Sequence, residues 1–335
     1  MSKQHINKLL FAILIAFSFP ALSADSDISS PSEIIKIMEE SSINYKVSFL
    51  KEGEVSDEYF EGKVLIPDSY IDTDDSVPVI KKYEVSAVIM ELFRKGDGYF
   101  INKEYDQAIN VWQEALEKAP NYFHLFTMIG DAHYMKKDFI KAKDYFLKTL
   151  SQNPIDYQAH WFLANAYKKM GNDASAIEHI MLAHIYNRYH PEIFKTLKGY
   201  LEDQNLVWDE WHFIPQYQLE KIKEDIQIRA SKNWLGYALV KALWKFEPNY
   251  PDTQRKSNLL LNPREEDEAI LMHTSKEEDA VLLDVIHSKM FSAFFHYEIA
   301  LRKFPDVYRS IPSDGVDDIV KYLWKYHIKS SEKNV

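Results

Sequence analysis

The 335-residue chain has no cysteine, few glycines and no excess of positive charge. Without cysteine there is no disulfide, no thiol nucleophile and no cysteine to carry a lipid. The 40 basic and 51 acidic residues give a net charge of −11. A nucleic-acid-binding surface needs a basic footprint, so we expect no nucleic acid partner. With only nine glycines and long stretches of helical periodicity, helix should dominate the fold.

Long apolar runs are also missing, and the longest one lies near the N-terminus. It covers the eleven residues from Leu9 to Phe19, whereas a membrane-spanning helix needs about 20. Lys3 and Lys8 precede this run and the small residues of 20–24 follow it, an order typical of a secretory signal peptide.

We therefore expect residues 1–24 to be removed, with cleavage after Ser23 or Ala24, and we expect a periplasmic protein of a Gram-negative bacterium. The alternative is an uncleaved N-terminal anchor. Removal of residues 1–24 leaves 38 basic and 51 acidic residues and a net charge of −13. No stable membrane insertion of the mature chain is expected.

Between residues 89 and 190 the sequence repeats itself every 34 residues. The first copy contains Gly96, Tyr99, Ala108, Trp112, Ala115, Leu116 and Pro120, which return as Gly130, His133, Ala142, Phe146, Thr149, Leu150 and Pro154. A further step reaches Ala164, Tyr167, Ala176, Ile180, Ala183 and His184. Such a period indicates stacked helix-turn-helix units that bury their apolar faces against one another. Small residues let the two helices of a unit approach closely, large residues fill the space between units, and proline ends the second helix.

The three copies, 89–122, 123–156 and 157–190, resemble tetratricopeptide repeats. The resemblance implies six antiparallel helices in three hairpins, with Ala108 and Ala142 buried where helices cross. It also implies a concave face that binds partners, since such arrays are more often scaffolds than catalysts. The third copy departs from the pattern, because Arg188 replaces the closing proline and Pro191 follows three residues later.

The predicted fold is therefore mainly α, a helical-hairpin solenoid with a small mixed N-terminal region, 25–88, and a helical C-terminal extension, 191–335. In the N-terminal region we expect a helix over 31–41 and short strands at 45–49 and 63–66. Four aspartates lie in the loop from Asp68 to Asp75. The loop lacks the glycine and the closing glutamate of a calcium-binding loop, so we predict a solvated loop without metal.

The C-terminal region shows further helical patterns. We expect helices over 192–204, 218–228, 234–246 and 316–328, and a long helix from Ser275 towards Phe304. Tyr297 and Pro305 have the spacing that Trp112 and Pro120 have in the first copy. A degenerate repeat over 274–307 is one interpretation of this region.

The resemblance also predicts which side chains meet a partner, since the partner-facing positions of the family lie on the first helix of each repeat. These positions hold Phe93, Asp97, Phe100, Thr127, Asp131, Tyr134, Trp161, Asn165 and Lys168. Phe93 and Asp97 occupy places where the family's clamp for a C-terminal carboxylate needs polar and basic residues. We therefore expect an extended or helical peptide with apolar anchors and a basic residue for the aspartates. The alternative is that the N-terminal or C-terminal regions of the chain itself cover these aromatic residues.

The sequence contains no nucleophile elbow, phosphate-binding glycine loop or zinc-binding histidine pair. We predict a protein that is not an enzyme and binds no cofactor. The other class left open is a carbohydrate-active or other enzyme with a catalytic C-terminal helical region. Its candidate site is the cluster 208–212, in which two tryptophans flank two carboxylates, an arrangement that could hold a sugar ring. Glycosidase carboxylates normally come from separate elements, which favours the binding protein.

Overall fold

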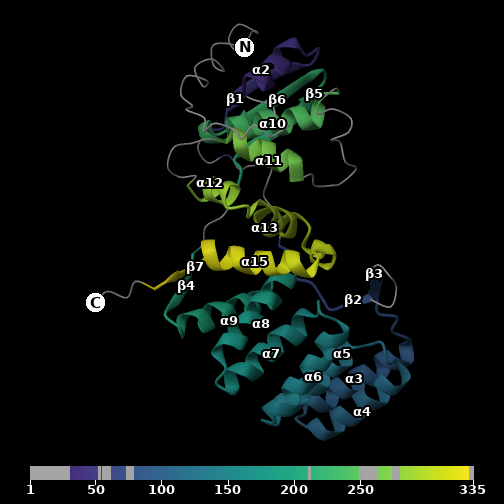
Figure 1. Ribbon diagram of the computed structural model, residues 1–335. Coiled ribbons are helices and arrows are strands. Elements are labelled where there is room, and N and C mark those ends of the chain that lie inside the picture. Colours follow the sequence, from purple (N-terminus) through teal and green to yellow (C-terminus); the bar gives the residue numbers. More distant parts are fainter. Residues whose placement is uncertain are drawn as a thin grey trace. The chain divides into compact units, whose positions relative to one another are not determined.

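The computed structural model describes residues 31–51, 54, 62–72, 79–209, 213–248, 250, 263–273 and 280–331. The chain divides into two compact units, of which unit 1 joins residues 1–61 to 212–298 and unit 2 joins 62–211 to 299–335. Both consist mostly of helices, as the sequence predicts (Figure 1). The compact units do not follow the predicted borders at residues 88 and 190, because unit 2 contains the repeats together with segments from both sides of them. The predicted signal peptide lies outside the described residues.

Unit 2 contains the three predicted helical hairpins. Their helices are α3 (Ala87–Ile101), α4 (Tyr105–Lys118), α5 (His124–Met135), α6 (Phe139–Gln152), α7 (Tyr157–Lys169) and α8 (Asp173–Tyr186). Each helix packs against the next one along the chain (Figure 1). A further helix, α9 (Pro191–Glu202), begins 34 residues after the start of α7 and packs against α8. The six helices of the prediction are therefore confirmed, and α9 is the first helix of a fourth step.

The same turn links the two helices of every hairpin. Lys103, Lys137 and Gly171 lie 34 residues apart and have positive φ angles of 63°, 64° and 75°. Glycine adopts this conformation easily, whereas the two lysines hold it because the helices on either side fix the chain. Asn205, one step further on, has a φ of 56°. Strand β4 (Leu206–Trp208) follows it in place of a second helix, so the array ends with half a repeat.

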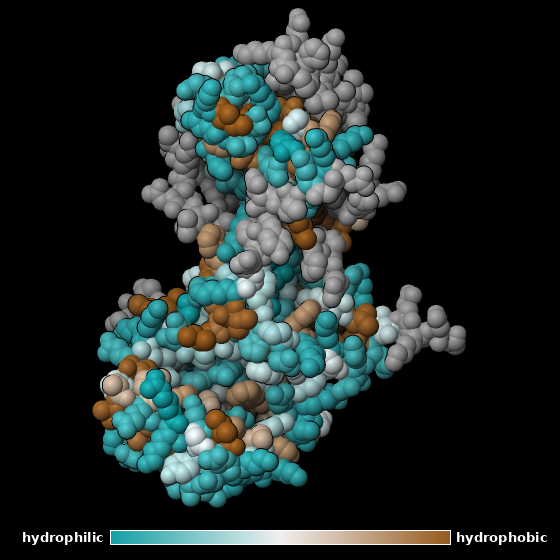
Figure 2. Space-filling model, turned by 180° about the vertical axis from the view of Figure 1, so that it is seen from behind, coloured by the Kyte–Doolittle hydropathy of each residue, from teal (hydrophilic) through white to brown (hydrophobic). Residues whose placement is uncertain are grey.

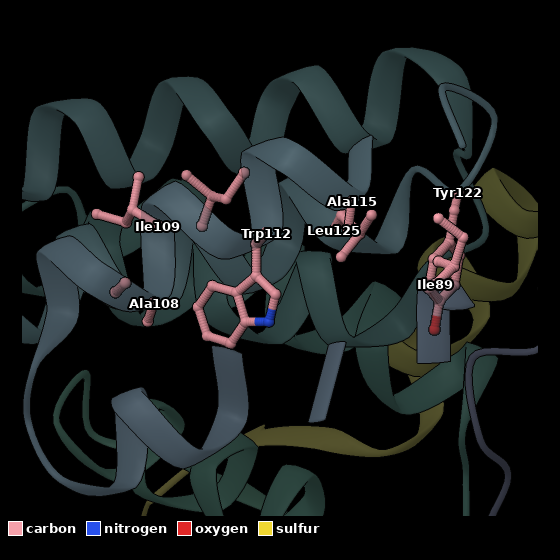
Figure 3. Close-up of a cluster of buried hydrophobic side chains, with 9 residues drawn as sticks. Ile89, Ala108, Ile109, Trp112, Ala115, Tyr122 and Leu125 are labelled. Atoms are coloured by element: carbon pink, nitrogen blue, oxygen red, sulfur yellow. The ribbon is translucent and has the colours of Figure 1, made fainter. Parts of the chain in front are cut away.

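Within a hairpin, close packing depends on a glycine that faces a large ring. The Trp112 side chain is fully buried in the cluster of Figure 3. A Cβ atom added to Gly96 would lie 2.2 Å from its Nε1 atom. Gly130 repeats this arrangement, with Phe146 Cε1 at 2.5 Å. Ala108 is buried as predicted, and so is Ala142 of the second hairpin. The small and large residues of the repeat thus have the packing roles inferred from their spacing.

The rest of unit 2 surrounds the array. It comprises β2 (Ser69–Asp72), β3 (Val79–Lys82), α14 (Leu301–Lys303), η3 (Pro305–Ser310), α15 (Ser313–Tyr326) and β7 (Ile328–Ser330). Strands β2 and β3 pair antiparallel, as do β4 and β7. Most of the second half of α8 is buried, since α7, α9, α15 and η3 pack around the helix. Apolar residues on several sides of a helix need such cover.

Unit 1 is built on a three-stranded sheet in the order β1-β6-β5. The elements of this unit are α2 (Pro31–Glu40), β1 (Asn44–Phe49), β5 (Tyr217–Ile222), β6 (Asp225–Ala230), η1 (Lys232–Trp234), α10 (Leu235–Phe246), α11 (Pro263–Met272), α12 (Ala280–His287) and α13 (Phe291–Phe294). Strand β1 is parallel to β6, and β5 is antiparallel to it. Helix α10 packs on β5, β6 and α2, with α11 beside it (Figure 1).

Three expectations for the flanking regions are corrected. The helix expected over 218–228 is the hairpin of β5 and β6, because Ile226 and Ile228 are buried and alternate with polar residues. Residues 63–66 form no strand. Asp68, expected in a solvated loop, forms ion pairs with Arg309 and, at 3.6 Å, with Lys82.

The long helix expected towards Phe304 is interrupted. Lys289, between α12 and α13, has a φ of 60°, and the Met290 amide donates to the Val285 carbonyl. This is the turn of the three hairpins, in which the Glu104 amide likewise donates to the carbonyl five residues before it, that of Tyr99. The π-helical segment η2 (Phe295–Ala300) follows α13. The candidate degenerate repeat therefore contains the turn that its sequence does not reveal.

Candidate protein-binding face

All nine predicted partner-facing residues lie on α3, α5 and α7, the first helices of the hairpins. We call their shared surface the first-helix face. One residue does not belong to it. Thr127 is fully buried, and its hydroxyl donates to the Thr149 hydroxyl on α6 at 3.1 Å. It is part of the core of the second hairpin, which corrects the prediction that it meets a partner.

The predicted aromatic row is partly structural. The Phe100 ring packs on Tyr105 and Trp112 of its own hairpin, with ring centroids 5.5 and 5.9 Å apart. The Phe93 ring stacks on His124 of α5 at 6.0 Å. Both phenylalanines remain partly exposed. Phe100 therefore tightens the first hairpin and Phe93 joins it to the second, in addition to any contact with a partner.

At the third repeat, the chain covers the face with its own fourth step. The Tyr200 hydroxyl of α9 donates to Asn165 Oδ1 at 2.7 Å. The Lys168 ammonium group lies 2.6 Å from Asp203 and 2.9 Å from Asp173, which raises its pKa. At this part of the face, residues of the C-terminal region supply partners for the polar groups of Asn165 and Lys168. The alternative that the chain's own regions cover the aromatic residues stays a prediction.

At the first two repeats, the face carries carboxylates without such partners. Within the described part of the chain, the Asp97 and Asp131 carboxylates form no hydrogen bond or ion pair. Burial raises the pKa of Asp131 to about 6 and also raises that of Asp97, which His124 partly offsets. Tyr134, one turn after Asp131, has a raised pKa because of burial and of the Asp131 charge. This part of the face therefore holds negative charge in a partly desolvated setting.

Several buried polar atoms on the first helices of the second and third repeats, or on residues that flank them, also lack hydrogen-bond partners. They are His124 Nδ1, Asp156 Oδ2, Gln158 Oε1, Trp161 Nε1 and His190 Nδ1. His124 Nδ1 and Asp156 Oδ2 are 3.6 Å apart, and the Trp161 ring meets that of His190 edge-on at 5.1 Å. Buried polar groups normally have partners, so such a group of atoms calls for a ligand or bound water. The resemblance places His124 on the partner-facing side of the second repeat, but the sequence does not single out Asp156 and His190, although they lie one 34-residue step apart.

A second edge of the array is filled by the chain itself, namely by residues 62–72. The side-chain amide of Asn187 accepts from the Leu65 amide at 3.1 Å and donates to its carbonyl at 3.0 Å. One repeat earlier, Asn153 Nδ2 donates to the Ser69 carbonyl at 3.2 Å. Tyr157 adds a hydrogen bond to the Leu65 carbonyl at 2.9 Å. The ends of the second helices thus hold an extended segment by its backbone.

A cleft of about 570 Å³ lies between this segment and the first hairpin. It is lined by Tyr70, Lys81, Lys82, Tyr83, Glu84, Ser86, Ile89, Lys118, Ala119, Pro120, Asn121 and Tyr122. Each of the three lysines is paired with a nearby carboxylate, such as that of Asp72 for Lys81. The cleft therefore has no excess of positive charge to attract an anionic ligand.

The family can now be named on a sequence match. Residues 90–122, which form α3 and α4 and the loop after them, match the family model of the tetratricopeptide repeat. The chain carries tetratricopeptide repeats. No curated protein sequence matches it.

Solved tetratricopeptide structures resemble about a third of the chain. The first such domain of human RPAP3 is 19% identical, with a TM-score of 0.33, over 35% of this chain and 91% of that one. The Sgt2 domain of Aspergillus fumigatus is 19% identical, with a TM-score of 0.33, over 36% of this chain and 80% of that one. The Yersinia enterocolitica secretion chaperone SycD, in complex with a peptide of the translocator YopD, is 14% identical, with a TM-score of 0.33, over 36% of this chain and 97% of that one.

The cluster 208–212 after the tetratricopeptide array does not form a sugar-binding platform in its described part. The Trp208 ring is stacked on His327 at 4.9 Å and meets Phe194 edge-on at 5.4 Å. The Asp209 carboxylate pairs with Lys329. Both side chains are engaged in packing, and residues 210–212 lie outside the described part.

The buried carboxylates of unit 1 have fixed partners in the same way. Glu247 accepts hydrogen bonds from the Ser41 hydroxyl at 2.6 Å and the Tyr45 hydroxyl at 3.0 Å. Glu266 accepts from Tyr237 and, at 2.6 Å, from the Lys241 ammonium group. Such saturated ion pairs hold elements together. Among the described residues, no three histidines or acids are placed to hold a metal ion, and no helix is long and apolar enough to cross a membrane.

Proposed function

We propose that this chain is a non-catalytic adaptor that binds an extended segment of another protein on the first-helix face, along its first two repeats and the partly exposed Trp161 at the start of the third. The observation that carries the proposal is the contrast along this face. Further along α7 the face is covered by α9, which satisfies Asn165 and Lys168. The first two repeats have no such cover among the described residues, and their carboxylates lack partners there. Surface of this kind, partly apolar and partly unsatisfied, is typical of an interaction site.

We also propose that the protein acts in the periplasm after removal of residues 1–24. The order of basic residues, a short apolar run and small residues supports export. N-terminal sequencing of protein from the periplasmic fraction should find Ala24 or Asp25 as the first residue. A membrane-associated form that begins with Met1 would contradict the proposal.

The binding role can be tested with a tryptophan on the face. Immobilised protein and its Trp161→Ala variant are incubated with periplasmic extract, and the retained proteins are compared. Aromatic anchors typically dominate interface energies, so the variant should lose at least about tenfold of the captured partner. Trp324→Ala is the matched control, because it removes another tryptophan that solvent reaches, one 42% exposed on α15, whereas Trp161 is partly exposed on α7. Equal capture by all three folded proteins would argue against the face.

A further inference from the structure

We infer that the segment bound on this face is basic, and that a lysine or arginine side chain of the partner lies against Asp97 and Asp131. The inference rests on the proposed function and names the chemistry of its partner. Within the described part of the chain, neither carboxylate forms an ion pair with a lysine or arginine, and only Asp97 feels the charge of a histidine, His124. Burial of a carboxylate without a counter-charge is unfavourable, so a bound cation would stabilise both.

The three repeats differ in charge at one equivalent position, and the difference follows the part of the face that α9 covers. Asp97, Asp131 and Asn165 are equivalent residues, one 34-residue step apart. Where α9 covers the face, the residue is the neutral Asn165, which accepts a hydrogen bond from Tyr200. In the two repeats that have no such cover among the described residues, it is an aspartate. At this position of the repeat, the negative charge thus occurs only outside the part of the face that α9 covers.

The surroundings of the two aspartates suit a long basic side chain. Ile101 and Met135, at the ends of α3 and α5, are 77% and 46% exposed and again lie one step apart. In the space-filling view, apolar residues reach the surface in separate patches among hydrophilic ones (Figure 2). The methylene groups of lysine and arginine pack on apolar side chains while their charged ends reach a carboxylate. The Tyr134 ring, one turn from Asp131, is partly exposed and packs on Phe139, and an aromatic ring attracts a nearby cation.

A second observation indicates that the ligand is a polypeptide and not a free cation. The indole N–H of Trp161 is buried and has no acceptor. His124, which is only 6% exposed and stacks on Phe93 beside Asp97, also has a ring nitrogen without a hydrogen bond. An indole N–H can only donate, so it needs an acceptor such as a peptide carbonyl. A polyamine has positive charge but no carbonyl, whereas an extended basic peptide has both.

Three short synthetic peptides provide the test. They share alternating leucines and differ only in carrying lysine, glutamine or glutamate at the other positions. Their affinities for the full-length protein are measured by fluorescence anisotropy. The lysine peptide should bind about tenfold or more tightly than the glutamate peptide, and its affinity should fall as salt is raised. Asp97→Asn combined with Asp131→Asn should remove most of this preference and its salt dependence.

Asp144→Asn is the matched control for the change in charge. Asp144 is 63% exposed on α6 and pairs with the neighbouring Lys143, away from the first-helix face. This variant should keep the preference for lysine. Spermidine, a cation without a carbonyl, should bind far more weakly than the lysine peptide.

Two results would overturn the inference: equal binding of the three peptides, including no binding by any of them, or unchanged lysine preference in the folded double variant. The capture experiment with Trp161→Ala keeps this outcome separate from the proposed function. If captured partners still depend on Trp161 while the peptides show no lysine preference, the face binds proteins but not through a basic segment. If neither experiment shows a difference, both proposals are wrong.

Discussion

Replacement of Asp131 by asparagine should stabilise the free protein while it weakens partner binding. Burial raises the pKa of this carboxyl from 3.8 to about 6, so at neutral pH the folded state carries a charge that its surroundings disfavour. A shift of this size corresponds to at most about 3 kcal/mol of folding free energy. Because the side chain is only partly buried, solvent screens it, and we expect Asp131→Asn to gain about 1–2 kcal/mol.

The pH dependence follows from the direction of the shift. The folded state binds the proton more tightly than the unfolded state, so protonation of Asp131 adds stability as the pH falls from about 6 towards 3.8. Above pH 6 the charged carboxylate lowers the stability of the wild type. Below pH 3.8 the carboxyl is protonated in both the folded and the unfolded state, and this loss of stability is absent. The advantage of the asparagine variant should therefore be largest at pH 7 to 8 and should disappear near pH 4.

Urea unfolding at pH 7.5 and pH 4, together with hydrogen exchange of the α5 amides, measures this difference. Asp144→Asn removes the same charge from an exposed site and should change stability by less than about 0.5 kcal/mol. A variant that is less stable than the wild type at pH 7.5, or equally more stable at both pH values, would refute the electrostatic reasoning. A gain in stability with loss of binding is typical of residues kept for function.

Further expectations concern the array and its flanking segment. Gly96→Ala should destabilise the fold by about 1–3 kcal/mol, because the added Cβ atom would collide with Trp112. Gly98→Ala should stabilise it by about 0.5–1 kcal/mol, because its Cβ atom would meet nothing within 4 Å and alanine favours a helix. Thermal melts that do not separate the two variants would contradict this packing. Asn187→Ala should cost about 1–3 kcal/mol and speed hydrogen exchange at Leu65, since it leaves the buried Leu65 amide without a partner and its carbonyl with the Tyr157 hydroxyl alone; unchanged exchange would argue against this contact.

The candidate site could be predicted from the sequence in part. Asp97 and Asp131 lie where the resemblance puts them, on the first helices, because equivalent residues of a repeat have equivalent positions. The burial of Thr127 could not be foreseen, since it depends on Thr149 of α6. The hairpin of β5 and β6 lies where the sequence analysis predicts a helix, although Ile226 and Ile228 alternate with polar residues as in a strand.

The sequence by itself determined the three hairpins, their turns and the contact of a glycine with a large ring in the first two. These features depend on residues close together in the chain, and the 34-residue period reproduces the same local chemistry each time. Only the tertiary structure decided which part of the first-helix face α9 covers, how residues 62–72 are held by Asn153 and Asn187, and that β1 pairs with β6. These contacts join segments that are distant in the chain and follow no common period, so their pairing is set by the path of the backbone in space and leaves no pattern in the sequence.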